Sequence, residues 1–250
     1  MINKNQELEI FSRHLILKEF KEDSFKNLQK QNISIIGIGG IGCPAAQYLV
    51  SAGIKNLKLI DSDVVSLSNL NRQILFNTND VGKYKSIVAK KKLLNINPNC
   101  KIKALKIKIK EKNIIEYLKN SSLIIDSTDN WETMILVNKF CVKNSIPLVS
   151  ASVIGFDSQV TLFLNNKKKH LCLQCIFPNK IEPDLARCDT VGVLGTAAGA
   201  AGLISAQKTI NYFISKKNNE IMTMIDMKTL KINSFRLKKN RKCIILKENY

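Results

Sequence analysis

Histidine is scarce in this chain, and several other features that point to common classes of function are also missing. His14 and His170 are its only histidines, which argues against mechanisms that need a histidine cluster. No apolar run reaches the roughly 18 residues that a membrane-spanning helix requires. The N-terminal stretch MINKNQELEIF has no long apolar segment of the kind that directs secretion. These absences predict a cytoplasmic protein without a membrane partner.

Arginine is also rare, although the chain is strongly basic. The formal net charge is +19, and lysine makes up nearly all of the 39 basic residues. Lys, Asn and Ile are abundant throughout, without a discrete basic tail, so the charge reflects a general compositional skew. Proteins that read nucleic-acid sequence depend on the bidentate fork of arginine, and no zinc-finger or RNA-recognition signature is present. Nucleic acid is therefore not the expected partner, whereas acidic protein surfaces would be attracted.

Cysteine occurs seven times, an odd number in a chain without a secretion signal. This combination argues against a disulfide framework. Thiol chemistry or metal ligation is expected for some of these residues and simple burial for the others.

Apolar patterning predicts an α/β protein. Short apolar runs bounded by Gly, Asp or Pro are typical of buried parallel strands, and apolar residues at helical spacing predict the helices between them. We expect strands at 32–37, 57–61, 122–128, 147–151 and 158–164, an alternating strand at 101–109, and short strands within 221–250. We expect helices within 1–31 and at 41–52, 83–95, 131–144 and 193–215, with a long loop at about 167–192. The predicted fold is Rossmann-like, with a mostly parallel central sheet flanked by helices and antiparallel C-terminal strands, in a single domain spanning 1–250.

A glycine-rich turn joins the first expected strand to the next helix. Gly37, Gly39, Gly40 and Gly42 form a G-x-G-x-x-G pattern there. Glycine allows a tight turn and close approach of a phosphate, and the helix N-terminus offers free N–H groups and positive potential. Asp61 ends the second strand, where a carboxylate accepts hydrogen bonds from ribose hydroxyls. The pattern predicts a nucleotide site but does not separate NAD from ATP.

Polar residues after the second strand favour ATP. ATP carries more negative charge than NAD, so its site needs cationic side chains and usually Mg²⁺. The residues available for this are Asp63, Asn69, Arg72, Gln73 and Lys85. The structural alternatives are that Lys85 is one more solvated lysine and that Asn69 and Arg72 cap a loop.

Asp129 and Asn130 follow another buried strand. Ligands of open parallel sheets lie outside the carboxyl ends of the strands, so Asp129 is a candidate for holding Mg²⁺ against a triphosphate. The alternative is that Asp129 caps the helix that starts near Trp131.

Together and in order, these segments resemble the ThiF/MoeB/HesA family, bacterial relatives of ubiquitin-activating enzymes. The resemblance runs from Arg13 to about Cys243 and is carried by GIGGIG, IDSDVVSLSNLNRQILF, GKYKS, IIDSTDN, GFDSQVTLF, CLQC and CDTVGVLG. It implies an adenylyltransferase that uses ATP and Mg²⁺ to adenylate the C-terminal glycine of a ubiquitin-like sulfur-carrier protein, releasing pyrophosphate. The segments VSASVIGFDSQVTLF and CPAAQYLVSAG are most similar to the branch that activates the carrier ThiS for thiamine thiazole biosynthesis. A MoeB-type activator of the molybdopterin synthase small subunit is the alternative.

The resemblance also implies roles for individual residues. The glycine loop would hold the ATP phosphates and Asp61 the ribose, while Asn69, Arg72 and Lys85 would contact the triphosphate. Asp129 would bind Mg²⁺, and Asp63, Gln73 and Asn130 complete the expected ATP site. Arg13 resembles an N-terminal arginine that reaches the triphosphate in the other subunit of a homodimer. The resemblance thus makes Arg13, Arg72 and Asp129 the expected catalytic residues for adenylation.

Cys188 matches the family's loop cysteine that is linked to sulfur transfer through an acyl-persulfide with the carrier, so it joins the expected catalytic residues. A thiolate near a helix N-terminus forms more easily than an isolated one, and the alternative is a small buried loop residue. No rhodanese-like domain follows Tyr250, so the expected sulfur donor is a separate protein.

Two positions depart from the family pattern. Cys172-x-x-Cys175 is half of a structural zinc site, to which the family adds a second C-x-x-C pair. Here Cys243 is present but Leu246 replaces the fourth ligand, so the sequence leaves Zn²⁺ undecided. Met134 stands where the family has Arg in the D-N-x-x-x-R stretch, and methionine cannot neutralise a negative charge.

Three other interpretations stay open. An NAD(P)-dependent oxidoreductase would explain the glycine turn and Asp61 but would leave Asp129 and Cys188 without a use. A dimeric scaffold that has lost catalysis would explain Met134 and Leu246. An enzyme that adenylates a peptide instead of a carrier is the third, and the short N-terminus counts against it.

Overall fold

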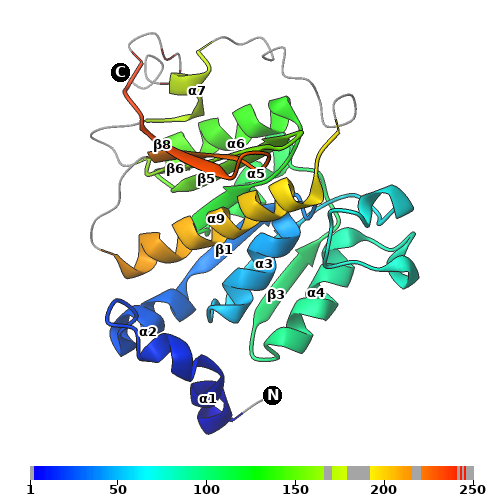
Figure 1. The fold of residues 1–250 in the computed structure, drawn as a ribbon, viewed down its shortest axis with the longest axis vertical. Helices are drawn as coiled ribbons and strands as arrows, with labels where there is room; N and C mark the ends of the chain where they lie inside the picture. Colours follow the sequence, from blue (N-terminus) through cyan, green and yellow to red (C-terminus); the bar gives the residue numbers. More distant parts are fainter. Residues whose placement is uncertain are drawn as a thin grey trace.

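A single eight-stranded sheet organises the chain in this computed structural model, which describes residues 3–165, 171–178, 192–215, 221–240, 243 and 245 (Figure 1). The strand order is β3-β2-β1-β4-β5-β6-β7-β8. Pairing is parallel from β3 to β5 and antiparallel from β5 to β8. The predicted fold class, a mostly parallel sheet with antiparallel C-terminal strands, is confirmed.

The parallel part of the sheet contains the apolar runs predicted as buried strands. Its members are β1 (Asn32–Ile36), β2 (Asn56–Ile60), β3 (Lys101–Leu105), β4 (Leu123–Asp126) and β5 (Leu148–Ile154). Ile36 pairs with Ile60 on one side and with Asp126 on the other, so three strands end level with one another. The chain order reverses between β1 and β4, and this reversal opens a crevice at the carboxyl ends of the strands.

The antiparallel part of the sheet consists of β6 (Asp157–Phe163), β7 (Ile221–Asp226) and β8 (Lys231–Arg236). The short strands predicted within 221–250 are thus confirmed by β7 and β8. Every side chain of the edge strand β8 is exposed.

Helices cover both faces of the sheet, and successive strand residues point alternately into two cores. On one face lie α1 (Lys4–Leu15), α2 (Glu22–Lys30), α3 (Gly42–Ser51), α4 (Lys85–Ile96) and α9 (Gly195–Ile214). On the other lie α5 (Glu111–Leu118), α6 (Trp131–Asn144) and the short α7 (Leu173–Ile176). Two 3₁₀ turns, η1 (Leu67–Asn69) and η2 (Thr78–Asp80), lie in the connection between β2 and α4.

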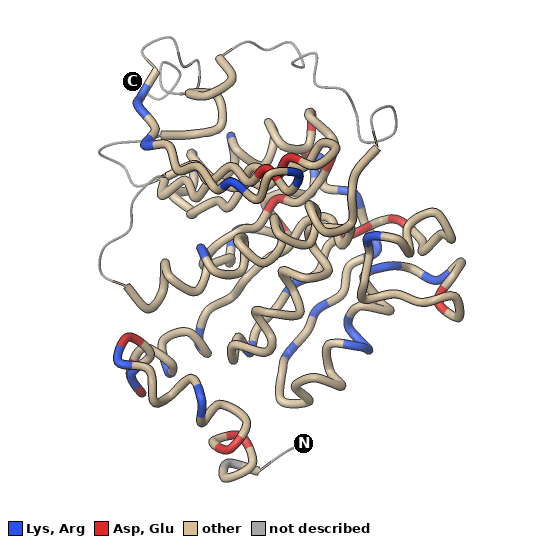
Figure 2. Tube along the Cα trace, in the orientation of Figure 1, with Lys and Arg blue, Asp and Glu red and all other residues tan. Residues whose placement is uncertain are grey.

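The apolar helix α9 packs along α3 and against β5 and β6 (Figure 1). A Cβ atom on Gly202 would lie 2.4 Å from the backbone oxygen of Ile41, so only glycine permits this approach. No helix among the described residues is long and apolar enough to cross a membrane. Lys and Arg are spread over many elements instead of gathering on one, which agrees with a compositional skew (Figure 2).

The structure differs from the sequence prediction after β3 and within the expected long loop. The strand predicted at 101–109 ends at Leu105, because its neighbour β2 has ended and the amide of Asp61 bonds the carbonyl of Leu105 at 3.1 Å. Ile107 and Ile109 then contribute to a cavity wall instead of a strand. Helix α5 was not predicted, and α7 forms inside the segment predicted as a loop.

Candidate active site

A cavity of about 680 Å³ opens at the carboxyl ends of β1, β2 and β4. This is the crevice that the strand order creates, and residues far apart in the sequence meet there. The residues predicted for nucleotide binding that line it are Gly37, Gly39, Gly40, Asp61, Asp63, Arg72, Gln73, Lys85, Asp129 and Asn130.

The glycine turn is held by contacts that leave no room for side chains. Gly37 has φ +86°, and a Cβ there would lie 2.8 Å from the Ser127 carbonyl oxygen. A Cβ on Gly42 would lie 2.0 Å from the carbonyl oxygen of Gly37. The Ser127 hydroxyl donates to that same oxygen at 2.7 Å. Gly42 lies beneath the turn and not among the cavity-lining residues, so its local effect is to close the turn onto α3.

Helix α9 supports the turn from the side. A Cβ on Gly40 would lie 2.9 Å from the Cβ of Ala198, and one on Gly195 would lie 2.5 Å from the backbone oxygen of Asn71. The small residues at the start of α9 thus allow the helix to approach both the turn and the segment that carries Arg72.

Asp61 connects the second strand to the glycine turn. Its carboxylate accepts hydrogen bonds from the amides of Ile38 at 2.7 Å and Asp63 at 2.8 Å. Burial raises the pKa of the Asp61 carboxyl, and these two hydrogen bonds oppose the rise. Each carboxylate oxygen retains acceptor capacity, which suits the predicted contact with ribose hydroxyls.

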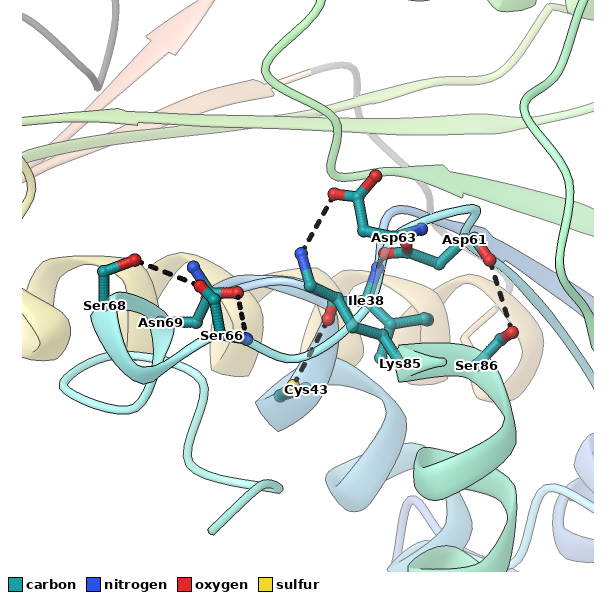
Figure 3. A network of polar contacts seen from close by, with 9 residues as sticks. All are labelled: Ile38, Cys43, Asp61, Asp63, Ser66, Ser68, Asn69, Lys85 and Ser86. Atoms are coloured by element: carbon teal, nitrogen blue, oxygen red, sulfur yellow. Dashed lines mark hydrogen bonds and ion pairs between the residues drawn. The ribbon is translucent and has the colours of Figure 1, made fainter. Parts of the chain in front are cut away.

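Lys85 is a buried cation in the cavity wall and not a solvated surface lysine, so the structural alternative for this residue is wrong. It is 7% exposed, and its Nζ lies 3.0 Å from Oδ2 of Asp63, whose side chain is largely exposed (Figure 3). The amide of Lys85 also donates to the carbonyl of Asp63 at 2.9 Å. The pair fixes the start of α4 beside the loop that follows β2, at the edge of the cavity.

Arg72 and Asn69, both predicted to contact the triphosphate, differ in their position relative to the cavity. Arg72 lines the cavity, and its Nη1 donates to the Ser68 carbonyl at 2.9 Å and to Asn71 Oδ1 at 3.0 Å. Asn69 instead accepts from the Ser66 amide at 3.4 Å and is not among the cavity-lining residues (Figure 3). The loop-capping alternative therefore holds for Asn69 and in part for Arg72. Gln73 is buried, and its Oε1 has no hydrogen-bond partner among the described residues.

The turn after β4 leaves the Asp129 side chain exposed at the cavity. The helix cap is Asn130, whose Oδ1 accepts from the Thr133 amide at 2.9 Å and the Thr133 hydroxyl at 2.8 Å. The alternative in which Asp129 caps α6 is therefore wrong. An exposed carboxylate that caps no helix, at the carboxyl end of a parallel strand, fits an Mg²⁺ ligand.

Asp126 is a residue that the sequence prediction did not single out. It is 1% exposed, and its Oδ1 accepts from both the amide and the hydroxyl of Thr128, at 3.1 and 2.8 Å. Burial raises the pKa of the Asp126 carboxyl to about 6, the hydrogen bonds from Thr128 lower it, and the charge of Asp129 raises it further. Asp126 organises the turn that carries Asp129.

Two further sets of residues line the cavity and were not predicted. One is an apolar wall of Ile107, Ile109, Trp131, Met134, Leu173 and Phe177, in which the Trp131 and Phe177 rings pack edge to face at 5.7 Å. The other is a polar floor from β5 and β6 that includes Ser150, Ser152, Asp157 and Gln159. Met134, the departure from the family pattern, thus faces the cavity.

Three cysteines meet beside the apolar wall. The sulfur of Cys172 lies 4.0 Å from that of Cys175 and 3.5 Å from that of Cys243, and all three ligand atoms lie within 4.8 Å of one another. The hydrogen bond from Cys172 lowers the pKa of the Cys175 thiol. Leu246, the departure from the four-cysteine pattern, lies outside the described residues.

Two predicted catalytic residues are not placed at the cavity. Arg13 is exposed near the end of α1 and does not line it. Cys188 lies outside the residues that the structure describes. Their roles stay predictions.

Comparison with known proteins agrees with this geometry. The chain is 36% identical over 200 residues to the sulfur carrier protein ThiS adenylyltransferase of Escherichia coli, covering 80% of this chain and 79% of that protein. It is 32% identical over 213 residues to the sulfur carrier protein adenylyltransferase of Thermus thermophilus, covering 84% and 79%.

A crystal structure of Escherichia coli MccB with AMPCPP and MccA has a TM-score of 0.80 at 23% identity, covering 98% of this chain and 74% of that one. That likeness shows a shared fold. The ThiF family model matches residues 11–245. Because this match spans nearly the whole sequence and is joined by the two adenylyltransferase relatives, the chain belongs to the ThiF family.

Proposed function

We propose that this protein uses ATP to adenylate the C-terminal glycine carboxylate of a ubiquitin-like sulfur-carrier protein. The observation that carries the proposal is one cavity that joins the glycine turn, Asp61, two cationic side chains and Asp129. The names of the relatives in Escherichia coli and Thermus thermophilus supply the class of acceptor.

The charge of the cavity supports ATP over NAD. Arg72 and Lys85 both line it. NAD has only two phosphates and does not need these two cations, whereas the triphosphate of ATP does. Asp129 lines the same space and would hold Mg²⁺, which when bound neutralises negative charge on the triphosphate. An oxidoreductase would have no use for this combination.

The reaction that this geometry supports is an in-line displacement at the α-phosphorus of ATP. An oxygen of the carrier's terminal carboxylate forms a bond to that phosphorus, and the bond from phosphorus to the bridging oxygen breaks, so that pyrophosphate leaves. The step requires no covalent nucleophile from the protein. The protein's contribution is to position two anions that repel each other and to neutralise their charge with Arg72 and Lys85.

The residues that are not placed at the cavity fit supporting roles in the same proposal. Arg13 is exposed on α1 and would reach the triphosphate bound by a second copy in a homodimer. In a later step, a persulfide on Cys188, with its outer sulfur supplied by a separate donor protein, would attack the carrier's acyl-adenylate, form the acyl-persulfide and release AMP. Adenylation itself does not require Cys188.

We favour a ThiS-like carrier in thiamine thiazole biosynthesis. A second candidate carrier has a specific observation in its favour, because the chain is 31% identical to the probable molybdopterin-synthase adenylyltransferase of Porphyra purpurea. It covers 60% of that protein, so the likeness concerns the part that aligns.

The direct test is mass spectrometry of the carrier after incubation with protein, ATP and Mg²⁺. The native chain is expected to add AMP to the carrier's C-terminus, and Asp129→Ala is expected to lower the yield at least about 100-fold. Asp129 is exposed and caps no helix, so the variant should fold normally.

Glu132→Ala is the matched control for this variant. Glu132 is an exposed carboxylate in the first turn of α6 that does not line the cavity, so its removal should leave the full yield. An Asp129→Ala protein with near-normal yield would show that the site is assigned wrongly.

A further inference from the structure

Ser127 lies between two parts of the cavity, the glycine turn and the turn that carries Asp129, and the proposed reaction gives it no role. It directly follows β4, and it is partly buried where it lines the cavity. Its amide and its hydroxyl both bond to the end of β1. Its carbonyl oxygen lies so close to Gly37 that a Cβ there would be only 2.8 Å away.

The peptide unit between Ile36 and Gly37 is held from both sides. Its carbonyl oxygen accepts hydrogen bonds from the amide and from the hydroxyl of Ser127, each at 3.0 Å. Its N–H group, on Gly37, donates to the carbonyl of Ile60 at the end of β2 at 2.9 Å. Because a peptide unit is planar, these bonds to β4 and β2 fix its orientation.

The next peptide unit, between Gly37 and Ile38, is held in the same way. The Ser127 hydroxyl donates to its carbonyl oxygen at 2.7 Å. Its N–H group donates to Oδ2 of Asp61 at 2.7 Å. Ser127 and Asp61 thus bond to opposite edges of one peptide unit. Glycine permits many backbone conformations, so contacts of this kind are needed to hold Gly37 in a single one.

We propose that Ser127 is a positioning residue for phosphate binding, whose hydroxyl works with Asp61 to orient the Gly37–Ile38 peptide unit. Gly39 and Gly40 follow this unit and line the cavity. The first amides of a helix have no partner within it, and they bind phosphate when they point toward it. A fixed peptide unit at Gly37 sets the direction of the amides that come after it. The inference rests on the proposed ATP site and does not depend on which carrier is adenylated.

A second link between β1 and β4 provides a matched control. The hydroxyls of Ser34, in β1, and Ser121, two residues before β4, lie 2.7 Å apart and are buried. This bond joins the same two strands at their amino ends, and neither serine lines the cavity. Its loss therefore shows the effect of removing a hydroxyl link between these strands without disturbing the glycine turn.

The test is calorimetric titration of Ser127→Ala and Ser121→Ala, in the full chain, with ATP and Mg²⁺. Ser127→Ala should weaken ATP binding about tenfold, since the turn loses a buried hydrogen bond. Its affinity for adenosine, measured by competition with ATP, should change less than about twofold, because adenosine has no phosphate. Ser121→Ala should lower the urea midpoint at least as much as Ser127→Ala but keep the native affinity for ATP.

Exchange kinetics distinguish positioning from a part in the chemical step. In carrier-dependent ATP–pyrophosphate exchange, the KM for ATP should rise about tenfold in Ser127→Ala while kcat stays within about twofold. The reason is that the turn holds the phosphates equally well before and during the reaction. A fall in kcat with an unchanged KM would place Ser127 in the chemical step and overturn the assignment.

Three results of the titrations would also overturn it. Ser127→Ala could bind ATP as tightly as the native chain. It could lose as much affinity for adenosine as for ATP, which would mean general damage to the cavity. Ser121→Ala could weaken ATP binding equally, which would mean that any link between β1 and β4 has the same effect. If the native chain shows exchange with no carrier, the proposed function fails, whereas the titrations still decide the role of Ser127.

Discussion

The two walls of the cavity are built by different means. The wall formed by the glycine turn and the start of α9 is defined by backbone positions, since added Cβ atoms on Gly42 and Gly195 would lie 2.0 and 2.5 Å from carbonyl oxygens. The opposite wall is made of side chains from α6 and α7 and is held by hydrogen bonds and the cysteine cluster. The two departures from the family pattern both concern this second wall. Met134 lines it, and Leu246 stands at the fourth position of the cysteine pattern whose other three members form the cluster behind it.

This contrast shows which parts of the site tolerate sequence change. A position where a side chain would overlap a backbone atom admits only glycine, so the wall formed by the glycine turn keeps its pattern. A wall of packed side chains admits exchange between residues of similar volume. The glycine pattern is therefore retained, while both departures from the family pattern, Met134 and Leu246, fall on or behind the other wall.

The largest expected effect comes from breaking the glycine wall with Gly42→Ala. The new methyl group overlaps the carbonyl of Gly37, so the free energy of unfolding should fall by about 3 kcal/mol or more. The affinity for ATP should fall at least about tenfold, because the turn can no longer close onto α3. Urea denaturation and calorimetric ATP titration measure the two effects.

Gly199→Ala is the matched control, because a Cβ at Gly199 has no heavy atom within 4 Å. Inside α9 it should stabilise the protein by about 0.5–1 kcal/mol. Equal effects of the two substitutions would contradict a wall that is defined by backbone contact.

The next effect concerns pH and the buried carboxylate that organises the Asp129 turn. Burial raises the pKa of Asp126 from 3.8 to about 6, so between these values the folded state holds a proton that the unfolded state has lost. The stabilisation from this proton is therefore fully present below about pH 4 and is lost as the pH rises to about 6. Over this range the free energy of unfolding falls by about 3 kcal/mol. Asp126→Asn removes this dependence while keeping an acceptor for Thr128.

Urea denaturation at pH 4.5 and pH 7.5, without nucleotide or Mg²⁺, measures the difference. The variant should gain stability relative to the native chain as pH rises. Glu132→Gln on the exposed side of α6 is the control for removal of a charge. A constant difference between Asp126→Asn and the native chain at both pH values would refute the account of Asp126.

The smallest expected effect comes from a substitution at Met134, in the wall made of side chains. Met134→Arg restores the family pattern at a cavity-lining position, and the added cation can hold the acceptor carboxylate. ATP–pyrophosphate exchange should rise by about tenfold, which corresponds to about 1.4 kcal/mol. Met134→Leu, which changes shape without charge, should stay within about twofold. A gain with leucine equal to that with arginine would mean that packing, and not charge, limits the reaction.

Sequence patterns predicted β1, β2, β4 and β5 because each is an apolar run, whereas the alternating run at 101–109 was predicted to continue beyond Leu105, where β3 ends. They also predicted Gly37 and Asp61 as cavity residues, because each directly follows the end of a strand, whereas Lys85 was predicted from the charge of ATP and the family resemblance. They left the role of Asp129 open between Mg²⁺ ligand and cap of α6, and the structure shows that the adjacent Asn130 is the cap.

The polar floor and the apolar wall were not predictable in the same way. Ser150 and Gln159 lie on different strands and come together only through the antiparallel pairing of β5 and β6. Leu173 and Phe177 lie in a segment with little periodicity. The proximity of Cys172 to Cys243 followed from family resemblance and not from any local pattern, since long-range contacts leave no short-range signal.

The most direct test of the central claim is ATP–pyrophosphate exchange by the purified native chain, run separately with a ThiS-type carrier and with the molybdopterin-synthase small subunit. We predict exchange that depends on a carrier with a free C-terminal glycine, with the ThiS-type carrier preferred. Exchange with the other carrier alone would keep the chemistry and change the pathway. No exchange with either carrier, from a protein that still binds ATP, would contradict carrier adenylation.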